Sequence, residues 1–257
     1  MIKQTILEEL RRIEQEEDVR IVYACEAGSR AWGFPSQDSD YDVRFIYVRP
    51  VEWYLSIFDK RDVIEKPISN MLDINGWDIK KALRLFRKSN PPLLEWLQSP
   101  ICYMEDSSVT EQIRLLTAEA FLPKSCMYHY LNMAKGNYRE YLQGEHVKIK
   151  KYFYVLRPVL ACAWIERYQT MPPMEFERLV DSIVPNGSEL KAVIAELLKR
   201  KRAGEELDLE PKINVINTYL DKQITYYEQL ASSMKGSQAI LDDRLDELFR
   251  FILKLSS

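Results

Sequence analysis

The sequence predicts an α+β fold, in which a small mixed β-sheet with flanking helices is followed by an all-helical domain. Two observations predict this order. Up to about residue 106, short runs of β-branched and aromatic residues alternate with helical segments. After the polar break Glu105-Asp106-Ser107-Ser108, strand signals largely vanish and helical periodicity takes over. We therefore expect two domains, residues 1–106 and residues 107–257.

The first segments predict a helix and two strands. Residues 3–16 place their apolar side chains on one face of a charged amphipathic helix. Residues 19–25 and residues 40–48 are rich in β-branched and aromatic side chains, which is typical of strands. Between these strands, residues 30–39 predict a short turn of helix and a polar loop.

Residues 62–66 and 71–74 predict a strand pair or one interrupted strand, and the dipeptide Asn75-Gly76 predicts a turn directly after them. Asp78 then predicts the beginning of a helix, because its charge suits the positive N-terminal end. That helix should carry a basic face of Lys80, Lys81, Arg84, Arg87 and Lys88. Helical periods beyond the polar break predict helices near 110–121, 124–142, 147–166, 173–183, 188–202, 211–233 and 240–255.

Composition narrows the class of protein. The formal net charge of the 257 residues is -3, which weakens an RNA-binding interpretation without excluding it. The four cysteines form no CxxC pair, so they indicate reduced thiols rather than a zinc site. No run of 18 apolar residues and no apolar leader occur, so we expect a cytoplasmic protein without a membrane partner. The oligomeric state is left open.

The chemistry is concentrated in Gly28-Ser29, a spacer, and Asp40 and Asp42. A Gly-Ser pair at the end of a strand lets backbone N–H groups approach phosphate oxygens closely, and the hydroxyl adds a donor. Asp40 and Asp42 are two residues apart on a predicted strand, so their carboxylates share a face and repel each other. A divalent cation removes that repulsion, and Mg²⁺ prefers carboxylate and phosphate oxygens. The pattern therefore predicts a metal-dependent site for a nucleoside triphosphate, in which two ions assist phosphoryl transfer.

A third carboxylate should complete this site, and Asp73 is the candidate. Its neighbours in Met71-Leu72-Asp73-Ile74 are apolar, which is a costly place for an unpaired charge. Its role would be that of a metal ligand or of a general base for the attacking hydroxyl. Glu65 and Asp78 are nearby alternatives.

The segment around these residues resembles the signature of the DNA polymerase beta nucleotidyltransferase superfamily. The stretches GSRAWGFPSQDSDYDVRFIYVRP, LDINGWDIKKAL, NPPLLEWLQSPI and KIKKYFYVLRP further resemble its RNA-repair-pathway branch of the RlaP or YcgL type, over residues 20–165. The resemblance implies a nucleotidyltransferase core fold. It also implies that Gly28 and Ser29 bind the triphosphate, and that Asp40, Asp42 and Asp73 are catalytic and hold two Mg²⁺ ions, with Mn²⁺ as the alternative.

Three further residues are candidates for nucleotide binding. Arg30 follows Ser29 and is placed to reach a phosphate, although it equally fits a solvated arginine. In the superfamily the helical domain lends lysines and aromatic residues to the nucleotide, which implies Lys151 for phosphate and Tyr152 for the base. The same run also fits a solvated basic helix face.

The expected activity is transfer of a nucleoside monophosphate from a triphosphate, ATP in the first instance, to a hydroxyl at an RNA end. An adenylyltransferase acting on a protein or small molecule is the second interpretation, and the acidic pI of about 5.7 favours it slightly. A nucleotide-binding module without turnover is the third. The sequence does not decide among these acceptors, because related folds serve many substrates.

Overall fold

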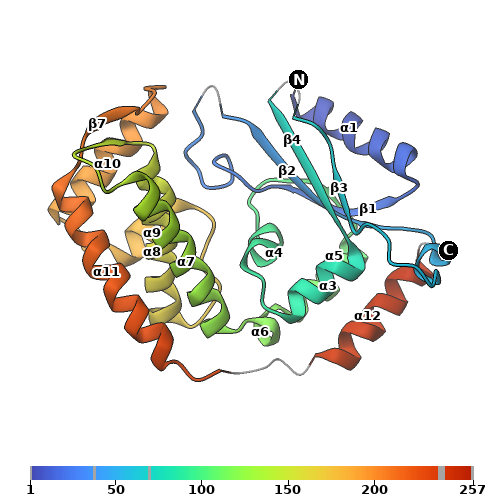
Figure 1. Cartoon of the computed structure of the whole chain (residues 1–257). Coiled ribbons are helices and arrows are strands. Elements are labelled where there is room, and N and C mark those ends of the chain that lie inside the picture. The colour runs from blue at the N-terminus through green and yellow to red at the C-terminus, as the bar shows by residue number, and fades with distance from the viewer. Residues whose placement is uncertain (1, 37–38, 69–70, 237–240, 256–257) are drawn as a thin grey trace. The chain divides into compact units, whose positions relative to one another are not determined.

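The computed structural model describes residues 2–36, 39–68, 71–236 and 241–255. Its elements form a five-stranded mixed sheet, a second sheet of two strands, and helices (Figure 1). This arrangement confirms the predicted α+β class, with the strands of the larger sheet all within the first 105 residues. None of the helices within the described ranges is long and apolar enough to cross a membrane.

The larger sheet has the strand order β3-β4-β2-β1-β5. Its strands are β1 (Arg20–Glu26), β2 (Tyr41–Val48), β3 (Val63–Glu65), β4 (Leu72–Asp78) and β5 (Cys102–Glu105). Strand β1 is antiparallel to both β2 and β5, and β3 is antiparallel to β4. Strands β2 and β4 are parallel, so their first residues lie at the same edge of the sheet.

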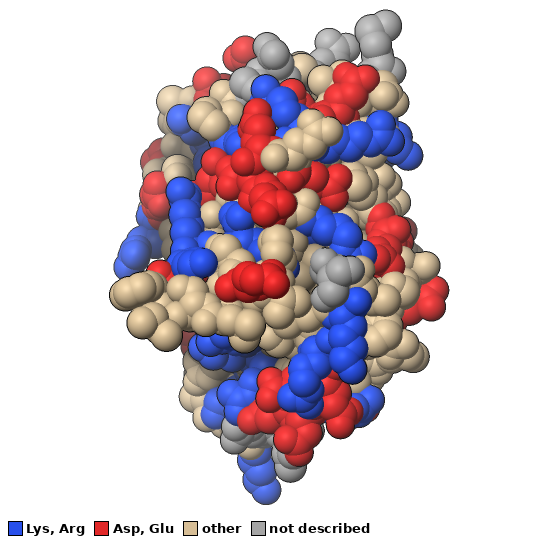
Figure 2. Space-filling view, turned by 90° about the vertical axis from the view of Figure 1, so that its right-hand side faces the viewer, with Lys and Arg blue, Asp and Glu red and all other residues tan. Residues whose placement is uncertain are grey.

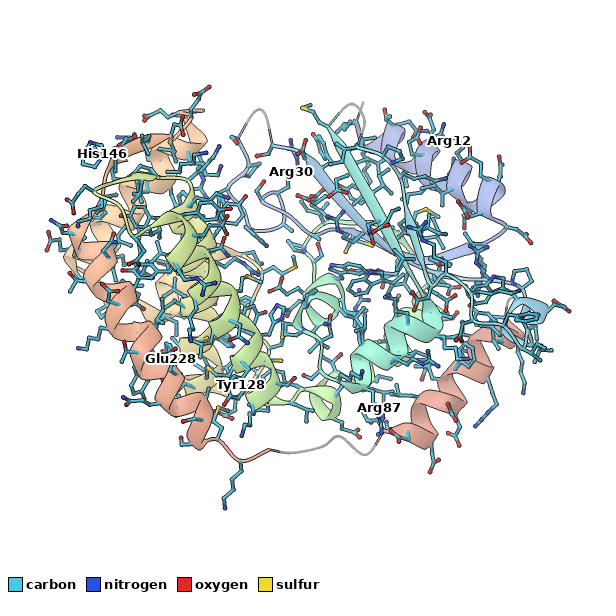
Figure 3. The ribbon with its side chains drawn as sticks, viewed as in Figure 1. Arg12, Arg30, Arg87, Tyr128, His146 and Glu228 are labelled. Carbon is cyan, nitrogen blue, oxygen red and sulfur yellow. The ribbon has the colours of Figure 1, made fainter. Side chains whose placement is uncertain are left out.

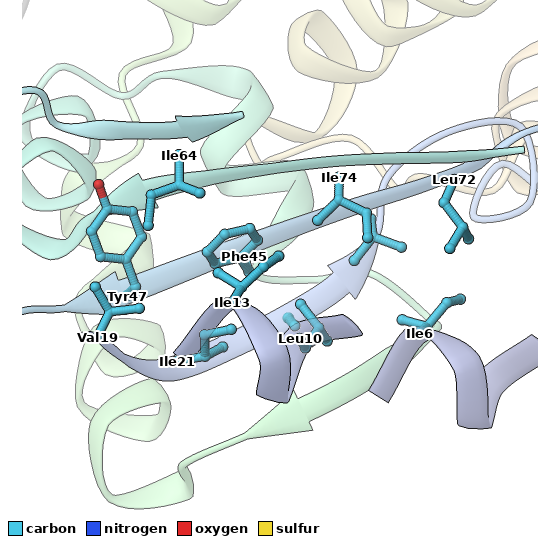
Figure 4. Packing of buried hydrophobic residues seen from close by; sticks show 12 residues of the cluster. Ile6, Leu10, Ile13, Val19, Ile21, Phe45, Tyr47, Ile64, Leu72 and Ile74 are labelled. Atoms are coloured by element: carbon cyan, nitrogen blue, oxygen red, sulfur yellow. The ribbon is translucent and has the colours of Figure 1, made fainter. Parts of the chain in front are cut away.

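Helix α1 (Ile2–Glu17) covers one face of this sheet, as predicted for residues 3–16. Its buried residues Ile6, Leu10 and Ile13 pack in one cluster with Phe45 and Ile74 of the central strands (Figure 4). The remaining helices of the sheet unit are α2 (Val51–Tyr54), α3 (Ile79–Arg87), α4 (Pro91–Trp96), α5 (Ser107–Leu115), α6 (Thr117–Ala120) and α12 (Asp242–Lys254). Since side chains alternate along a strand, every second side chain of β2 and β4 points to the face of the sheet opposite α1.

The second unit is mainly helical. Its elements are α7 (Pro123–Tyr141), β6 (His146–Lys148), α8 (Lys151–Tyr168), α9 (Phe176–Ile183), α10 (Glu189–Arg202), β7 (Leu209–Pro211) and α11 (Asn214–Ser233). The predicted helix over 147–166 was wrong at its beginning, because residues 146–148 pair with β7 as an antiparallel strand. Val147 is buried in that pairing, whereas its two neighbours are exposed.

The two compact units are not consecutive segments of the chain. Residues up to 31, 39–120 and 239–257 cluster with the sheet, and residues 32–38 and 121–238 cluster with the helices. Relative to the predicted boundary at residue 106, α5, α6 and α12 therefore belong with the sheet. The units are groups of residues in contact, and they do not test the predicted division into domains 1–106 and 107–257. That division stays a prediction.

The segment after the Gly-Ser pair is anchored in the helical unit. Phe34 is 1% exposed, and its ring lies 4.9 Å from that of Phe153 and 5.5 Å from that of Phe176. The backbone N–H of Phe176 donates to the Trp32 carbonyl over 2.9 Å, and Arg202 donates to the Gly33 carbonyl over 3.0 Å. The chain therefore leaves the sheet unit between the two halves of the motif and then returns to it.

Asn75-Gly76 lies within β4 rather than in the predicted turn, and that prediction was wrong. The glycine has a packing role there. A Cβ atom built on Gly76 would lie 2.2 Å from ring atoms of Phe45, so the ring fills the space that a side chain would need. The helix prediction beyond this point is confirmed, since the Asp78 side chain caps α3 by accepting from the Lys80 N–H over 2.8 Å.

Gly76→Ala should therefore destabilise the fold by about 1–3 kcal/mol, because the methyl group forces Phe45 out of its place. Urea unfolding measures this loss as a lower midpoint with an unchanged slope. Gly136→Ala is the matched control, since among the described residues no atom outside the neighbouring backbone of α7 lies within 4 Å of its built Cβ. That variant should be as stable as the wild type or more so, by about 0.4–1 kcal/mol. Equal stability of Gly76→Ala and wild type would contradict the packing role.

Candidate active site

The two halves of the motif meet where β1 ends and β2 begins. A Cβ atom on Gly28 would lie 1.7 Å from Oδ2 of Asp42, so the carboxylate occupies the space beside the bare Cα. The Ala27 N–H also donates to the Asp42 carbonyl over 2.9 Å, which ties the turn to the strand. Only glycine fits at position 28 while Asp42 keeps this place.

The parallel pairing of β2 and β4 sets Asp42 and Asp73 beside each other. The two residues are direct partners in the register, as are Tyr41 and Leu72 one step before. Since Leu72 faces the α1 core, both carboxylates project to the other face of the sheet. Their side chains are 29% and 31% exposed, respectively. The structure thus brings together two of the three predicted acids in a half-buried setting.

Arg44, which the sequence analysis did not single out, links these two carboxylates. One guanidinium nitrogen donates to Oδ1 of Asp42 over 3.2 Å and to Oδ2 of Asp73 over 2.7 Å. The other donates to the Asp73 carbonyl over 2.8 Å. The arginine therefore supplies a positive charge between two acids that would otherwise repel each other. Its signal in the sequence was the spacing, since residue 44 shares the strand face of residue 42.

Glu26 is a second residue that the sequence analysis did not identify. Its side chain is completely buried, accepts from the Asp42 N–H over 2.8 Å, and accepts from the Tyr103 hydroxyl over 2.6 Å. Ser99 donates to its carbonyl over 2.6 Å. A carboxylate that ends an apolar strand immediately before the Gly-Ser pair was the available signal. These bonds hold the start of β2 against the end of β1.

The environment of Asp42 disfavours its charge. Burial raises the pKa of this carboxyl from 3.8 to about 6, and Arg44 opposes the rise. The charges of Glu26, Asp73 and Asp40 raise it further. Three neighbouring acids and partial burial thus make this the position in the site where an added cation relieves the most repulsion.

Arg30 and Asp40 lie at the edge of this site. Arg30 donates to the Ser39 carbonyl over 2.7 Å and to the Asp40 carbonyl over 3.3 Å, and its guanidinium lies 3.6 Å from the Tyr41 ring centroid (Figure 3). The side chain is therefore held by the start of β2 rather than freely solvated. Asp40 itself is exposed, and its charge is close enough to act on Asp42.

The two candidates from the helical unit differ in their surroundings. Tyr152 is fully buried, its hydroxyl donates to Oδ1 of Asn217, and it accepts from the Ile213 N–H over 2.8 Å. Its ring is completely buried in this structure, and its predicted contact with a base stays a prediction. Lys151 is half-buried, with Nζ 4.0 Å from the ring centroid of Tyr141 and 5.0 Å from that of Tyr154. Its phosphate contact stays a prediction.

The donor chemistry of the site fits a hard divalent cation. Among the described residues, no group of three His, Cys, Asp or Glu side chains is arranged to hold a metal ion. Asp42 and Asp73 nevertheless provide adjacent carboxylate oxygens, which Mg²⁺ prefers, and Arg44 supplies a cation between them. Asp40 is near this pair without converging on it. The predicted metal ligands Asp40, Asp42 and Asp73 therefore stay predictions.

The chain belongs to the RNA repair pathway DNA polymerase beta family (RlaP), whose family model matches residues 2–251. This confirms the resemblance and extends it beyond residue 165. The chain is 57% identical over 252 residues to the uncharacterized protein YcgL of Bacillus subtilis (strain 168), covering 98% of this chain and 95% of the relative. Family and site together support a nucleotidyltransferase of the polymerase beta type.

A solved nucleotidyltransferase-like protein from Exiguobacterium sibiricum 255-15 is a distant match. It is 11% identical and has a TM-score of 0.30, with 95% of this chain and 87% of that chain covered.

The raised pKa of Asp42 predicts a pH dependence of stability in metal-free buffer. Because the folded pKa of about 6 exceeds the ordinary value of 3.8, the folded state binds the proton more tightly. Stability is therefore lost as pH rises from about 4 to 7, by roughly 3 kcal/mol for this one group. Asp42→Asn should lack this loss. As pH rises from about 4 to 7, the unfolding free energy of the variant should therefore rise relative to that of the wild type. Parallel stability profiles from pH 4 to 7 would contradict the assignment.

Proposed function

We propose that this protein transfers a nucleoside monophosphate from a nucleoside triphosphate, with ATP as the donor, to a hydroxyl at an RNA end. The observation that carries the proposal is the paired setting of Asp42 and Asp73 directly beside the Gly28-Ser29 turn. The family supports the same reaction class and names an RNA repair pathway. The family description supports the RNA acceptor, and the paired carboxylates beside the turn support the chemistry.

Divalent metal ions belong to this proposal, because nucleotidyltransferases of the polymerase beta type generally use them. Asp42 and Asp73, with Asp40 as the third ligand, would hold two Mg²⁺ ions, and Mn²⁺ is the alternative. When bound, the metal supplies positive charge that stabilises the phosphate oxygens and favours ionisation of the acceptor hydroxyl. Arg44 occupies the space between the two carboxylates and would have to give up at least one of its bonds to them.

The chain's own residues would bind the donor and accept a proton. The backbone N–H groups of the Gly28-Ser29 turn would donate to phosphate oxygens, and the Ser29 hydroxyl adds one donor. Arg30, held at the start of β2, would donate to the triphosphate. The acceptor oxygen attacks the α-phosphorus, the bond to the bridging oxygen breaks, and pyrophosphate leaves. Asp73 would take the proton of the attacking hydroxyl.

A protein or small-molecule acceptor is the second candidate, and the charge of the chain favours it. The net charge is -3, and Figure 2 shows a face on which acidic and basic side chains are interspersed, with neither sign covering it. An RNA-binding surface is usually more basic. Transfer of label therefore has to be followed on RNA, protein and small molecules separately.

Incubation with Mg²⁺ and ATP labelled at the α-phosphate should place label on total RNA. Asp42→Asn and Asp73→Asn should each lower that transfer by at least about 100-fold, since both carboxylates act at the reacting phosphate. Asp243→Asn, at an exposed position of α12, is the matched control and should keep wild-type activity. Circular dichroism establishes that the inactive variants are folded.

Three outcomes would reject parts of the proposal. Label on cell protein or on a metabolite, with none on RNA, would replace the acceptor with the second candidate. Turnover that persists in Asp42→Asn would reject the site. Absence of label from every fraction would favour a nucleotide-binding module without turnover.

A further inference from the structure

Two neighbouring cavities lie along α3, away from the carboxylates of the site. The first, of about 540 Å³, is lined by residues of α3 and α12. The second, of about 360 Å³, is lined by α3 and by residues between 53 and 62. Lys80 and Arg84 line both cavities, and both are exposed. They are four residues apart on one helix, so they project from the same face.

The basic residues of these cavities include charges without a carboxylate partner. Lys81 pairs with Asp62 over 2.9 Å, and Arg87 pairs with Asp242 across from α3 to α12 (Figure 3). In the part of the chain that the structure describes, no ion pair is made by the four other basic residues, which are Lys60, Lys80, Arg84 and Arg250.

The two cavities have fewer acidic residues without an ion pair than basic ones. Asp78 is buried, caps α3 and accepts from the Tyr54 hydroxyl over 2.8 Å, so its carboxylate is already satisfied. Asp78 makes no ion pair, and Asp59 and Asp246 are the other acids in the two linings that make none among the described residues. The unpaired charges thus favour an anion in both cavities.

Aromatic side chains stand among these cations. Phe58 is 75% exposed in the second cavity, and the Lys60 ammonium lies 5.4 Å from the Trp53 ring centroid beside it. Phe249 lines the first cavity, where its ring packs edge-on against Tyr54 at 5.2 Å. Single-stranded nucleic acids are bound by this combination, with bases stacked on aromatic rings and phosphates next to cations.

We propose that the two cavities form one binding groove for single-stranded RNA, called the α3 groove and defined by Lys60, Lys80, Arg84, Phe58 and Arg250. The inference rests on the proposed function, since it gives the acceptor strand a place to bind. Asp73 and Asp78 are five residues apart on β4, which corresponds to about 17 Å along the strand. About five stacked nucleotides span that length at 3.4 Å each. The groove binds the body of the strand, and the reacting end lies beyond it.

Binding of a labelled single-stranded oligoribonucleotide of about 12 nucleotides to the full-length chain, in EDTA and at several salt concentrations, tests the groove. The double variant Lys80→Glu/Arg84→Glu should bind at least about tenfold more weakly. The slope of log affinity against log salt should also fall by about two, because two phosphate contacts are lost. Fluorescence anisotropy measures both quantities without turnover.

Phe58→Ala tests the stacking part of the groove separately. Affinity should fall by about 5- to 100-fold, while the salt slope stays that of the wild type, since no charge is removed. A polyphosphate of equal charge should compete poorly with the oligoribonucleotide. Equal competition, or an unchanged affinity of Phe58→Ala, would overturn the assignment to RNA in favour of a simple anion site.

Lys3→Glu/Lys222→Glu is the matched control, because it changes the net charge equally at two exposed lysines outside the groove. This control should keep the wild-type affinity. An equal loss in the control and in the groove variant, or no binding by the wild type, would overturn the groove. Both results are independent of the transfer assay. RNA labelling that persists in Lys80→Glu/Arg84→Glu would reject the groove alone and leave the proposed function in place.

Discussion

The close approach of the Asp42 carboxylate to Gly28 is the contact on which the candidate site depends. A carboxylate can lie against the turn only where no Cβ is present, and the built Cβ of residue 28 would overlap Oδ2 at 1.7 Å. This contact places the predicted triphosphate-binding turn directly beside an acid. The Asp42 N–H is held at the same time by the buried Glu26, so backbone and side chain are fixed by the same strand end.

The charge balance around Asp42 explains how the site is stable before any ligand is bound. Two half-buried acids in register would repel each other strongly, and Arg44 donates to both. Separating a half-buried charge from its partner is costly, so an incoming cation must replace what the arginine provides. In the proposed function, a metal ion would exchange one positive charge for another at this place. Without it, Arg44 acts as the internal counter-ion of Asp42 and Asp73.

Local signals in the sequence predicted much of the fold. The order of strands and helices followed from apolar periodicity, and the helix beginning at Asp78 followed from its capping chemistry. Asn75-Gly76 was misjudged because the glycine makes room for Phe45, a residue on the neighbouring strand. The pairing of β6 with β7 was also missed. Both are three-residue strands, and each is defined by a partner about 60 residues away in the sequence.

The candidate site could be predicted where its residues are close in sequence. It was harder to predict where the pairing of strands brings distant residues together. Gly28, Ser29 and Asp42 could be identified from a short motif. Asp73 required a guess about which later strand lies next to β2, and the parallel register places it opposite Asp42. Glu26 and Arg44 had weak signals, namely an acid directly before the Gly-Ser pair and an arginine on the strand face of Asp42, and both signals are common. Their roles follow from bonds across strands, which periodicity does not contain.

The loop that joins the two halves of the motif adds a constraint that neither half predicts. Trp32, Gly33 and Phe34 bond and pack within the helical unit, whereas Ser29 and Asp40 belong to the sheet unit. Ser29 and Trp32 are three residues apart, so at most about 11 Å of chain separates the triphosphate-binding turn from its anchor. Because Phe34 packs among α8 and α9, the predicted triphosphate-binding turn is joined through a few residues to a segment that is held in the helical unit.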